Sequence, residues 1–274
     1  MVVNGKTKIT GIFGYPIEHT LSPLMHNSAF SELGLNICYI PFKVSPDDLS
    51  DAVKSIRSLN MAGVNITVPH KENVIHLLDR VDEEAAFIGA VNTIINQEGM
   101  LTGYNTDGRG FMSSLAEESV SVENKEAVII GTGGAARAVS YYLSEKASKL
   151  SMFDIDRNKA DTLVHDLGKI RNNVFVLDSP DDIGNPDILI NATPLGLNAG
   201  DPLPVNVDLI SSQMVVCDLI YRKTPLLFIA SEKGAKTVDG SGMLLWQGVL
   251  AFELWTGVKA PVDTMRHELL SRIS

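Results

Sequence analysis

A glycine cluster near the middle of the chain is the first feature that could do chemistry. Apolar residues 128–130 lead into it, and residues 138–143 then carry apolar side chains at a helical spacing. The cluster consists of Gly131, Thr132, Gly133, Gly134 and Ala135. Such a turn between a strand and a helix leaves backbone N–H groups at the positive end of the helix, where phosphate groups bind. The pattern predicts a dinucleotide-binding turn, with an ordinary strand–helix connection as the alternative.

An acidic residue after the next apolar run favours the dinucleotide interpretation. Asp154 follows residues 150–153, which have the composition of a buried strand. A carboxylate at this position of a dinucleotide-binding unit accepts hydrogen bonds from the ribose hydroxyls.

A second group of polar side chains lies in the first hundred residues. Asn65 and Thr67 are two residues apart in a predicted strand, so they point to the same face. Lys71 follows in a predicted short helix, on the carboxyl side of that strand, where open α/β sheets bind their ligands. Taken alone, a lysine after a proline is most simply a solvated charge.

The elements that position these residues alternate along the chain. In the first hundred residues we predict strands at 7–13, 37–44, 63–68 and 90–96, with helices at 22–33 and 49–59, one containing Lys71 and one opened by Asp82. Ser22 is the expected N-cap of the first helix, Pro23 its first residue, and Gly34 its stop. The alternation predicts an α/β domain with a largely parallel sheet.

The second half repeats this alternation as a nucleotide-binding unit. We predict strands at 127–131, 150–154, 174–177, 188–191, 215–219 and 237–239. A helix at 107–115 connects the two domains, with Asp107 as the alternative N-cap of a helix starting at Gly108. Residues 243–255 form a buried helix ended by Gly257, and Pro261 opens another. We expect these last two helices to pack on the first domain, giving two α/β lobes with a cleft between them.

Composition excludes several classes of protein. The 274 residues, 45% hydrophobic and 20% charged, are those of a soluble globular protein. The net charge of −10, with no basic stripe, argues against nucleic acid as a partner. We find no apolar run of membrane-spanning length and no signal peptide, so we expect a cytoplasmic protein without a membrane partner. Cys38 and Cys217 are expected to be buried free thiols.

Four motifs along the chain resemble those of the shikimate dehydrogenase family. They are residues 65–71 (NITVPHK), 103–108 (GYNTDG), 20–23 (TLSP) and 239–244 (DGSGML), and they occur in order and with family spacing. The resemblance implies a substrate-binding domain of residues 1–106 plus 243–274 and a Rossmann-type, doubly wound dinucleotide-binding domain of residues 107–242. It also implies reversible NAD(P)-dependent reduction of 3-dehydroshikimate to shikimate, on the route to chorismate and the aromatic amino acids.

The resemblance assigns Lys71 and Asp107 as the catalytic pair. Oxidation of a secondary alcohol requires a group that takes the hydroxyl proton while hydride leaves to the nicotinamide. A lysine side chain can do this where desolvation favours its neutral form and a nearby carboxylate orients it.

The resemblance also assigns the substrate contacts. Hydroxyl groups at Thr20 and Ser22 would hold the substrate carboxylate. The family usually has serine at both positions, so the extra methyl group of Thr20 crowds this end. The ring hydroxyls would contact polar side chains, which are Asn65, Thr67, Lys71, Asn92, Asp107 and Gln247. Tyr221 is a further candidate. For Asn92 and Gln247 the alternative is hydrogen bonding to loop backbone.

The nucleotide contacts follow from the glycine turn and the strand ends. They are Gly131, Thr132, Gly133, Gly134, Ala135, Asp154, Ile155, Asp156, Arg157, Lys159, Leu219, Gly240 and Met243. Family members that use NADP commonly carry Asn-Arg-Thr where this chain has Asp154-Ile155-Asp156. Asp154 favours NAD because it suits ribose hydroxyls and repels a phosphate dianion. Arg157 and Lys159 keep NADP, the family default, as the alternative.

Two other functions are alternatives to this enzyme. A quinate/shikimate dehydrogenase that prefers NAD is the alternative enzyme, and a shikimate-binding regulatory protein of the same fold is the alternative without catalysis. His19, His26 and His70 have neither an acidic partner nor metal-ligand spacing, so we interpret them as structural and predict no metal site. A homodimer is a further expectation about partners.

Overall fold

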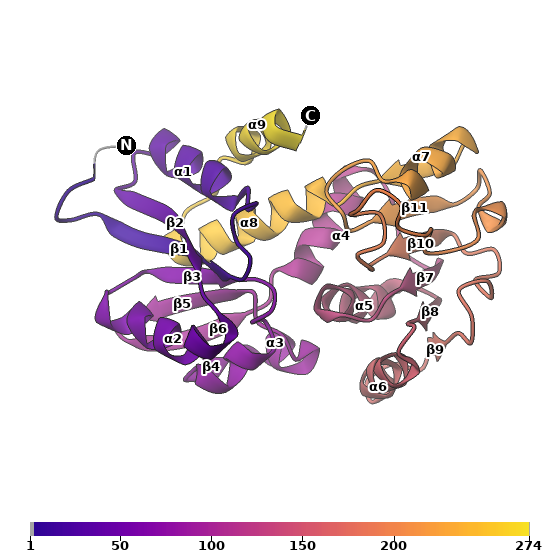
Figure 1. Cartoon of the computed structure of the whole chain (residues 1–274), viewed down its shortest axis with the longest axis horizontal. Coiled ribbons are helices and arrows are strands. Elements are labelled where there is room, and N and C mark those ends of the chain that lie inside the picture. Colours follow the sequence, from indigo (N-terminus) through magenta and orange to yellow (C-terminus); the bar gives the residue numbers. More distant parts are fainter. Residues whose placement is uncertain (1–2, 274) are drawn as a thin grey trace. The chain divides into compact units, whose positions relative to one another are not determined.

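The chain folds into two compact units. The computed structural model describes residues 3–273. Unit 1 comprises Met1–Thr106 and Leu245–Ser274, and unit 2 comprises Asp107–Leu244. The chain therefore leaves unit 1 after Thr106 and returns to it within a single helix. In Figure 1 unit 1 runs from indigo to magenta and ends in yellow, whereas unit 2 runs from magenta to orange.

Unit 1 is built on a six-stranded mixed sheet. Its strands are β1 (Lys8–Gly14), β2 (Ile37–Lys43), β3 (Gly63–Ile66), β4 (Arg80–Val81), β5 (Thr93–Gln97) and β6 (Met100–Tyr104). Its helices are α1 (Ser22–Glu32), α2 (Leu49–Ser58), α3 (Glu83–Ile88), α8 (Ser241–Thr256) from Leu245 onward and α9 (Val262–Ile273), with short 3-10 turns η1 (Pro46–Asp48) and η2 (Asn73–Leu77).

The strand order of unit 1 is β2-β1-β3-β5-β6-β4. β1 pairs in parallel with β2 and β3, and β4 with β6, but β5 runs antiparallel to both of its neighbours. We predicted neither β4 nor β6. β6 follows β5 through a tight turn in which Glu98 and Gly99 both have positive φ, 54° and 91°. Such a two-residue turn makes an antiparallel hairpin, so this part of the sheet is not parallel.

Alternating residues of β3 face two different layers of unit 1. Val64 and Ile66 join the apolar core beneath α2. Asn65 points the other way, where its neighbours come from β2 and β5. Gly63 faces the same side as Asn65, because a side chain there would collide with Trp255 of α8. α9 and the part of α8 from Leu245 onward belong to this unit, and α9 packs on α1 (Figure 1).

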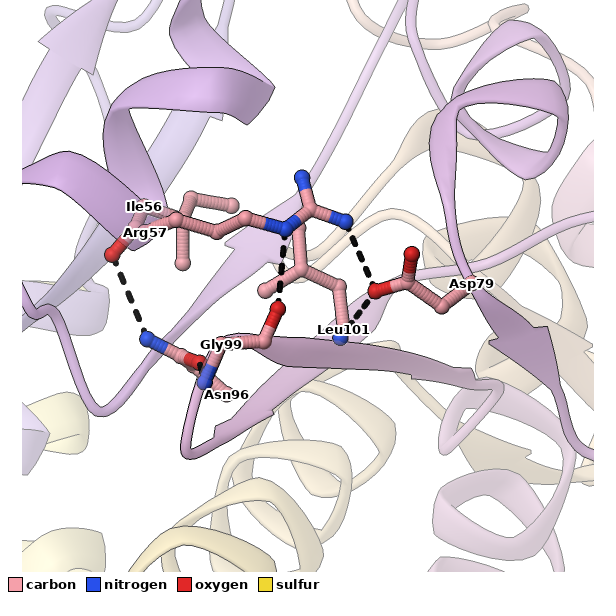
Figure 2. A network of polar contacts seen from close by, with 6 residues as sticks. All are labelled: Ile56, Arg57, Asp79, Asn96, Gly99 and Leu101. Atoms are coloured by element: carbon pink, nitrogen blue, oxygen red, sulfur yellow. Dashed lines mark hydrogen bonds and ion pairs between the residues drawn. The ribbon is translucent and has the colours of Figure 1, made fainter.

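A polar network ties α2 to the β5–β6 hairpin (Figure 2). Arg57 donates from Nε to the Gly99 carbonyl at 2.8 Å and from Nη2 to Asp79 Oδ2 at 2.7 Å. Asp79 also accepts the Leu101 N–H at 2.7 Å. Asn96 donates to the carbonyl of Ile56 at 3.3 Å. Both the helix and the hairpin turn are thereby held on the sheet that carries Asn65.

Unit 2 contains a second sheet in which every pair of strands is parallel. Its strands are β7 (Glu126–Ile130), β8 (Lys149–Phe153), β9 (Val174–Val176), β10 (Ile188–Asn191), β11 (Val215–Asp218) and β12 (Lys236–Val238), in the order β12-β11-β10-β7-β8-β9. Its helices are α4 (Asp107–Glu117), α5 (Gly134–Lys146), α6 (Arg157–Gly168) and α7 (Pro225–Glu232), together with η3 (Val207–Leu209) and the start of α8.

The chain reverses its direction of travel across this second sheet between β7 and β10. It runs from β7 outward to β9, then returns to β10 beside β7 and continues outward to β12. In doubly wound sheets ligands bind at the carboxyl ends of the two strands at such a reversal. Within residues 3–273 no helix is long and apolar enough to cross a membrane.

Candidate active site

The glycine turn of unit 2 lies at this reversal and has the backbone geometry of a phosphate cradle. Gly131 directly follows β7 with a φ of 97°, and a Cβ there would lie 3.0 Å from backbone atoms of Ala192, so only glycine fits. At Gly133 and Gly134 a Cβ would meet nothing within 4 Å, and the N-terminus of α5 has no side-chain cap. Ala135 follows in the first turn of α5. Open backbone at the start of a 13-residue helix fits a pyrophosphate.

Asp154 is bound to this turn through its carboxylate. Oδ2 accepts the backbone N–H of Thr132 at 2.7 Å and its hydroxyl at 2.8 Å, while Oδ1 accepts the N–H of Asp156 at 2.9 Å. Partial burial would raise the pKa of Asp154, but these hydrogen bonds and the nearby charge of Lys159 outweigh it and lower the pKa. The ionised carboxylate therefore fixes the shape of the glycine turn as well as ending β8.

The residues after Asp154 differ in their freedom to meet a ligand. Ile155 is 96% exposed. Asp156 caps α6 by accepting the Asn158 N–H. Arg157 donates to Asp161 at 3.0 Å and also pairs with Asp178, and both carboxylates raise the pKa of its guanidinium. Of the two basic residues that we considered for a 2′-phosphate, Arg157 is thus already paired with two carboxylates. Lys159 is exposed, and its charge acts on Asp154.

The other predicted nucleotide contacts follow β11 and β12. Gly240 packs so closely on the loop after β11 that a Cβ would lie 2.1 Å from the Leu219 carbonyl oxygen. Its N–H also donates to the Ile220 carbonyl at 3.0 Å. This glycine is therefore required for packing between two loops. Met243 is buried in the first turn of α8, and Tyr221 is exposed in the loop after β11.

A buried polar network at the carboxyl ends of β10 and β11 escaped the sequence analysis. Asp218, 1% exposed, accepts hydrogen bonds from Asn191 Nδ2 at 3.1 Å, the Thr224 hydroxyl at 2.7 Å and the Ile220 N–H at 3.0 Å. Asn191 in turn accepts the N–H and hydroxyl of Thr193. Burial raises the pKa of the Asp218 carboxyl against the effect of these donors. The missed signal was that two neighbouring buried strands both end on a polar residue.

In unit 1, Thr20 and Ser22 begin α1, but not as predicted. Ser22 is the first residue of the helix and Leu21 occupies the N-cap position, without a side-chain hydrogen bond. The hydroxyl that accepts a backbone N–H is that of Thr20, from Ser22 at 3.4 Å. The prediction that Ser22 caps the helix is therefore wrong. Burial raises the pKa of the Tyr39 hydroxyl on β2, and the Ser22 hydroxyl near it counteracts part of this rise.

Asn65 is held on three sides by side chains and backbone of neighbouring strands. Its Oδ1 accepts the Tyr39 hydroxyl at 2.8 Å, and its Nδ2 donates to the Asn92 carbonyl at 3.1 Å and to Thr93 Oγ1 at 3.0 Å. Thr67 lies one residue beyond the end of β3, because the strand ends at Ile66 and not at residue 68 as predicted. Thr67 and Asn65 still follow one extended backbone, since the Thr67 N–H donates to the Phe13 carbonyl of β1 at 3.0 Å.

Asn92 and Gln247 are connected through Thr106. Asn92 Oδ1 accepts the Thr106 N–H at 2.9 Å, and Asn92 Nδ2 donates to the Thr106 hydroxyl at 2.9 Å. That hydroxyl donates to the backbone carbonyl of Gln247 at 3.1 Å. Asn92 thus binds loop backbone, which was the alternative interpretation for it, whereas Gln247 takes part through its own backbone carbonyl.

Lys71 is anchored beside Asn92 by its backbone. Its carbonyl oxygen accepts the Val91 N–H at 2.8 Å. We predicted Lys71 within a helix, but it lies in a turn before η2, which starts at Asn73. The preceding His70 is buried and its Nε2 lies 2.8 Å from the Val44 carbonyl oxygen. Contacts of the neighbouring backbone therefore hold the turn that carries Lys71.

Asp107 is the first residue of α4 and is buried. It directly follows Thr106, whose backbone and hydroxyl are bound by Asn92. Asp107 therefore stands one residue beyond the hydrogen-bonded network of unit 1, where unit 2 begins. The helix begins at Asp107, one residue earlier than in the alternative, where Asp107 is the N-cap of a helix that starts at Gly108.

The histidines that we interpreted as structural have different surroundings. His26 is fully buried and stacks on Tyr39 with ring centroids 4.5 Å apart, and neither of its ring nitrogens has a hydrogen-bond partner. Burial lowers its pKa to about 3. His19 is exposed. Over residues 3–273 there is no group of three or more His, Cys, Asp or Glu that could hold a metal ion. Cys217 is buried as expected, whereas Cys38 is only partly so.

The strand order of unit 2 and the glycine turn at its reversal define a Rossmann-type dinucleotide-binding protein. Comparison with known proteins narrows this class. Residues 12–94 match the shikimate dehydrogenase substrate binding domain, and residues 240–270 match the shikimate 5′-dehydrogenase C-terminal domain. The chain is 45% identical to the shikimate dehydrogenase (NADP(+)) of Desulforamulus reducens, over 99% of this chain and 98% of that protein. The chain belongs to the shikimate dehydrogenase family.

Solved structures agree with this assignment. A shikimate dehydrogenase in complex with NADP+ is 39% identical, with a TM-score of 0.94, and the match covers 100% of this chain and 98% of that one. The shikimate 5-dehydrogenase of Listeria monocytogenes, in complex with shikimate and NAD, is 36% identical, with a TM-score of 0.89 and 97% coverage of both chains.

Proposed function

We propose that this protein is an NAD(P)-dependent oxidoreductase that interconverts 3-dehydroshikimate and shikimate. The observation that carries the proposal is the polar network of unit 1. It joins Asn65, Asn92 and the backbone of Gln247, three positions that the family resemblance assigned to substrate. Hydroxyl and amide groups without charge suit a ligand rich in hydroxyl groups. We include in this proposal a cytoplasmic role in the route to chorismate and the aromatic amino acids.

The proposed chemistry divides between Lys71 and Asp107. Lys71 takes the proton of the substrate hydroxyl, and Asp107 accepts a second hydroxyl and orients the lysine. Bound at the glycine turn, the nicotinamide cofactor supplies the acceptor of the hydride. The Gly131–Ala135 backbone would hold its pyrophosphate, and Leu219, Gly240 and Met243 would make further contacts with the cofactor. Thr20 and Ser22 bind the carboxylate, while Thr67 and Tyr221 contact the rest of the substrate.

A spectrophotometric assay tests this function directly. Purified protein is given shikimate with NAD or NADP across neutral to alkaline pH, and reduced cofactor is followed by its absorbance. We expect turnover with shikimate. Protein that binds shikimate in calorimetry but reduces neither cofactor would support the regulatory alternative. Quinate in the same assay tests the alternative substrate, and sedimentation of the pure chain tests the expected homodimer.

We further propose that NAD is the preferred cofactor. The ionised Asp154 carboxylate at the end of β8 repels a 2′-phosphate, and the exposed Ile155 offers it no hydrogen bond. Arg157 is engaged by two carboxylates and so offers little attraction. Lys159 is the cation that would favour NADP, the cofactor for which several relatives are named.

A double substitution tests the cofactor preference. Asp154→Asn combined with Ile155→Arg removes the repulsion and adds a guanidinium, so kcat/KM should shift toward NADP. Asn keeps an oxygen that can accept from Thr132, which protects the glycine turn. Lys159→Ala is the matched variant, and it should weaken use of NADP alone. An unmodified enzyme that prefers NADP tenfold or more, about 1.4 kcal/mol, would contradict the proposal.

A further inference from the structure

A cavity of about 510 Å³ lies in unit 1 between its sheet and the end of α8, and every residue that lines it belongs to this unit. It is at the end of the sheet away from the proposed substrate contacts. Lys8, which lines it, begins β1, whereas the loop that carries Thr20 and Ser22 follows the end of that strand. Sites for small molecules in proteins have volumes of roughly 300–1,000 Å³, so this cavity can hold one.

Strand register decides which side chains face the cavity. Gly63 of β3 faces α8, since a Cβ there would lie 2.5 Å from Trp255 Nε1. The residues paired with Gly63 on β1 and β5 share that face. Side chains alternate along a strand, so Lys8 and Gln97, each two residues from one of these partners, also face α8.

The inner wall of the cavity is apolar and fixed in place. Met61 and Ile95 are buried, and Leu254 and Trp255 of α8 complete the wall. Trp255 Nε1 donates to the backbone carbonyl of Ile94 at 3.0 Å, which holds the ring against the sheet. An apolar group can therefore pack on this wall without a rearrangement of the fold.

Two opposite charges line the same cavity and are not used by the fold. Lys8 and Glu98 are both exposed. Within residues 3–273, neither the ammonium group of Lys8 nor the carboxylate of Glu98 has an ion-pair or hydrogen-bond partner. A ligand with a carboxylate and an ammonium group can satisfy both, whereas a ligand with only one charge is attracted by one residue and repelled by the other.

We propose that this cavity binds a free α-amino acid with an apolar side chain. The ligand carboxylate pairs with Lys8 and its ammonium group with Glu98, while the Gln97 amide can bond to either group. The apolar side chain packs on Leu254 and Trp255. This inference does not rest on the proposed function, because the cavity shares no residue with the proposed substrate and nucleotide contacts.

A titration followed by the amide chemical shifts of the full chain in NMR tests the inference. L-leucine is the probe. Isocaproate is the same molecule without the ammonium group, and isoamylamine is the same molecule without the carboxylate. We expect L-leucine to bind with a Kd of about 1 mM and each analogue to bind about fivefold more weakly, because both ion pairs are exposed.

The position of the shifts shows where the probe binds. L-leucine should shift the amides of Ala62 and Gln97, which line the cavity, and not those of the glycine turn. L-leucine that shifts neither of the two at about 10 mM, ten times the expected Kd, would overturn the inference. Analogues that bind as tightly as L-leucine would overturn it as well.

Two substitutions assign the charged contacts. Lys8→Met should weaken binding of L-leucine about fivefold and make it no tighter than that of isoamylamine. Glu98→Gln should likewise remove the preference for L-leucine over isocaproate. Both side chains are exposed, so these variants should fold. Lys54→Met, the same substitution at an exposed lysine of α2 outside the cavity, is the control and should bind normally. Unchanged binding of L-leucine by the Lys8 and Glu98 variants would overturn the inference.

Discussion

The two units organise polar groups in opposite ways. In unit 1 the network from Tyr39 to the Gln247 carbonyl consists of neutral hydroxyls and amides. The imidazole of His26, which stacks on Tyr39, has no hydrogen-bond partner. In unit 2 the corresponding loops are held by carboxylates, Asp154 at the glycine turn and Asp218 at the ends of β10 and β11.

The difference follows from what each network must hold. A carboxylate accepts several donors at once and so fixes the shape of a loop. Asp154 accepts two backbone N–H groups, and Asp218 accepts one backbone N–H and two side-chain donors. Hydroxyls and amides can exchange partners with a polyol at little cost, because each is both donor and acceptor. The neutral network thus suits a substrate, and the charged one suits a permanent backbone fold.

The largest effect is expected when Lys71, the proposed proton acceptor, is removed. Lys71→Ala should lower kcat by roughly 10²–10⁴-fold while shikimate binding stays largely intact, because a proton acceptor acts mainly in the transition state. Steady-state kinetics and calorimetry separate the two effects, and Lys54→Ala, an exposed lysine of α2, is the control. A near-normal kcat with a raised KM would make Lys71 a binding residue. Asp107→Ala should lose both rate and affinity.

The next largest effect is a pH dependence of the free energy of unfolding, which should have opposite signs in the two units. His26 titrates at about 3 when folded and 6.5 when unfolded, so its stabilising contribution is complete above pH 6.5 and is lost as the pH falls toward 3. At 1.36 kcal/mol per pH unit, unit 1 should lose roughly 3 kcal/mol of unfolding free energy between pH 6.5 and 4. The raised pKa of Asp218 acts oppositely: it stabilises unit 2 at low pH, and this is lost as the pH rises through the folded pKa.

Tryptophan fluorescence during urea unfolding measures this difference. The chain has two tryptophans, Trp246 and Trp255, and both lie in unit 1. His26→Phe should flatten the acid side of the unit 1 profile, while Asp218→Asn should leave that profile unchanged. A His26→Phe profile as steep as that of the unmodified protein would show that other groups cause the acid sensitivity.

A smaller effect should change the KM for the cofactor and not the KM for shikimate. Asp218→Asn replaces one of the two acceptor oxygens, which bind the Ile220 N–H and the Asn191 amide, by an NH2 group. The KM for the cofactor should therefore rise about tenfold, with the KM for shikimate unchanged. Asp208→Asn, the same substitution at an exposed carboxylate of unit 2, is the control. Equal effects on both KM values would mean that Asp218 maintains the protein as a whole and not the nucleotide loops.

The smallest effect is expected at the start of α1. Ser22→Ala should raise the KM for shikimate several-fold without changing that for the cofactor, because it removes a proposed donor to the carboxylate. Since Ser22 is not the N-cap, the loss of about 1 kcal/mol typical of a missing cap is not expected. Ser28→Ala in the same helix is the control. An unchanged KM for shikimate would move the carboxylate site elsewhere.

Hydrophobic patterning was enough to predict most of the strands and helices from the sequence. The strands of unit 2 agree within a residue or so at each end, because each is a short apolar run bounded by turn residues. β6 was missed because its Thr102, Gly103 and Tyr104 break the apolar pattern, and β4 because two residues carry no period. The direction of β5 was missed because the Glu98–Gly99 turn is a weak hairpin signal.

The amino-acid sequence by itself determined the fold class, the glycine turn and the family, since local patterns and short motifs carry that information. Only the tertiary structure decided which polar groups bind one another. Ser22 was predicted to cap its own helix, yet Leu21 occupies the N-cap position, and Asp154 reaches back to Thr132. Tyr39 and Asp218 had no motif to mark them. Their roles arise because folding brings distant strand ends together, where each buried polar group must find a partner that local sequence does not specify.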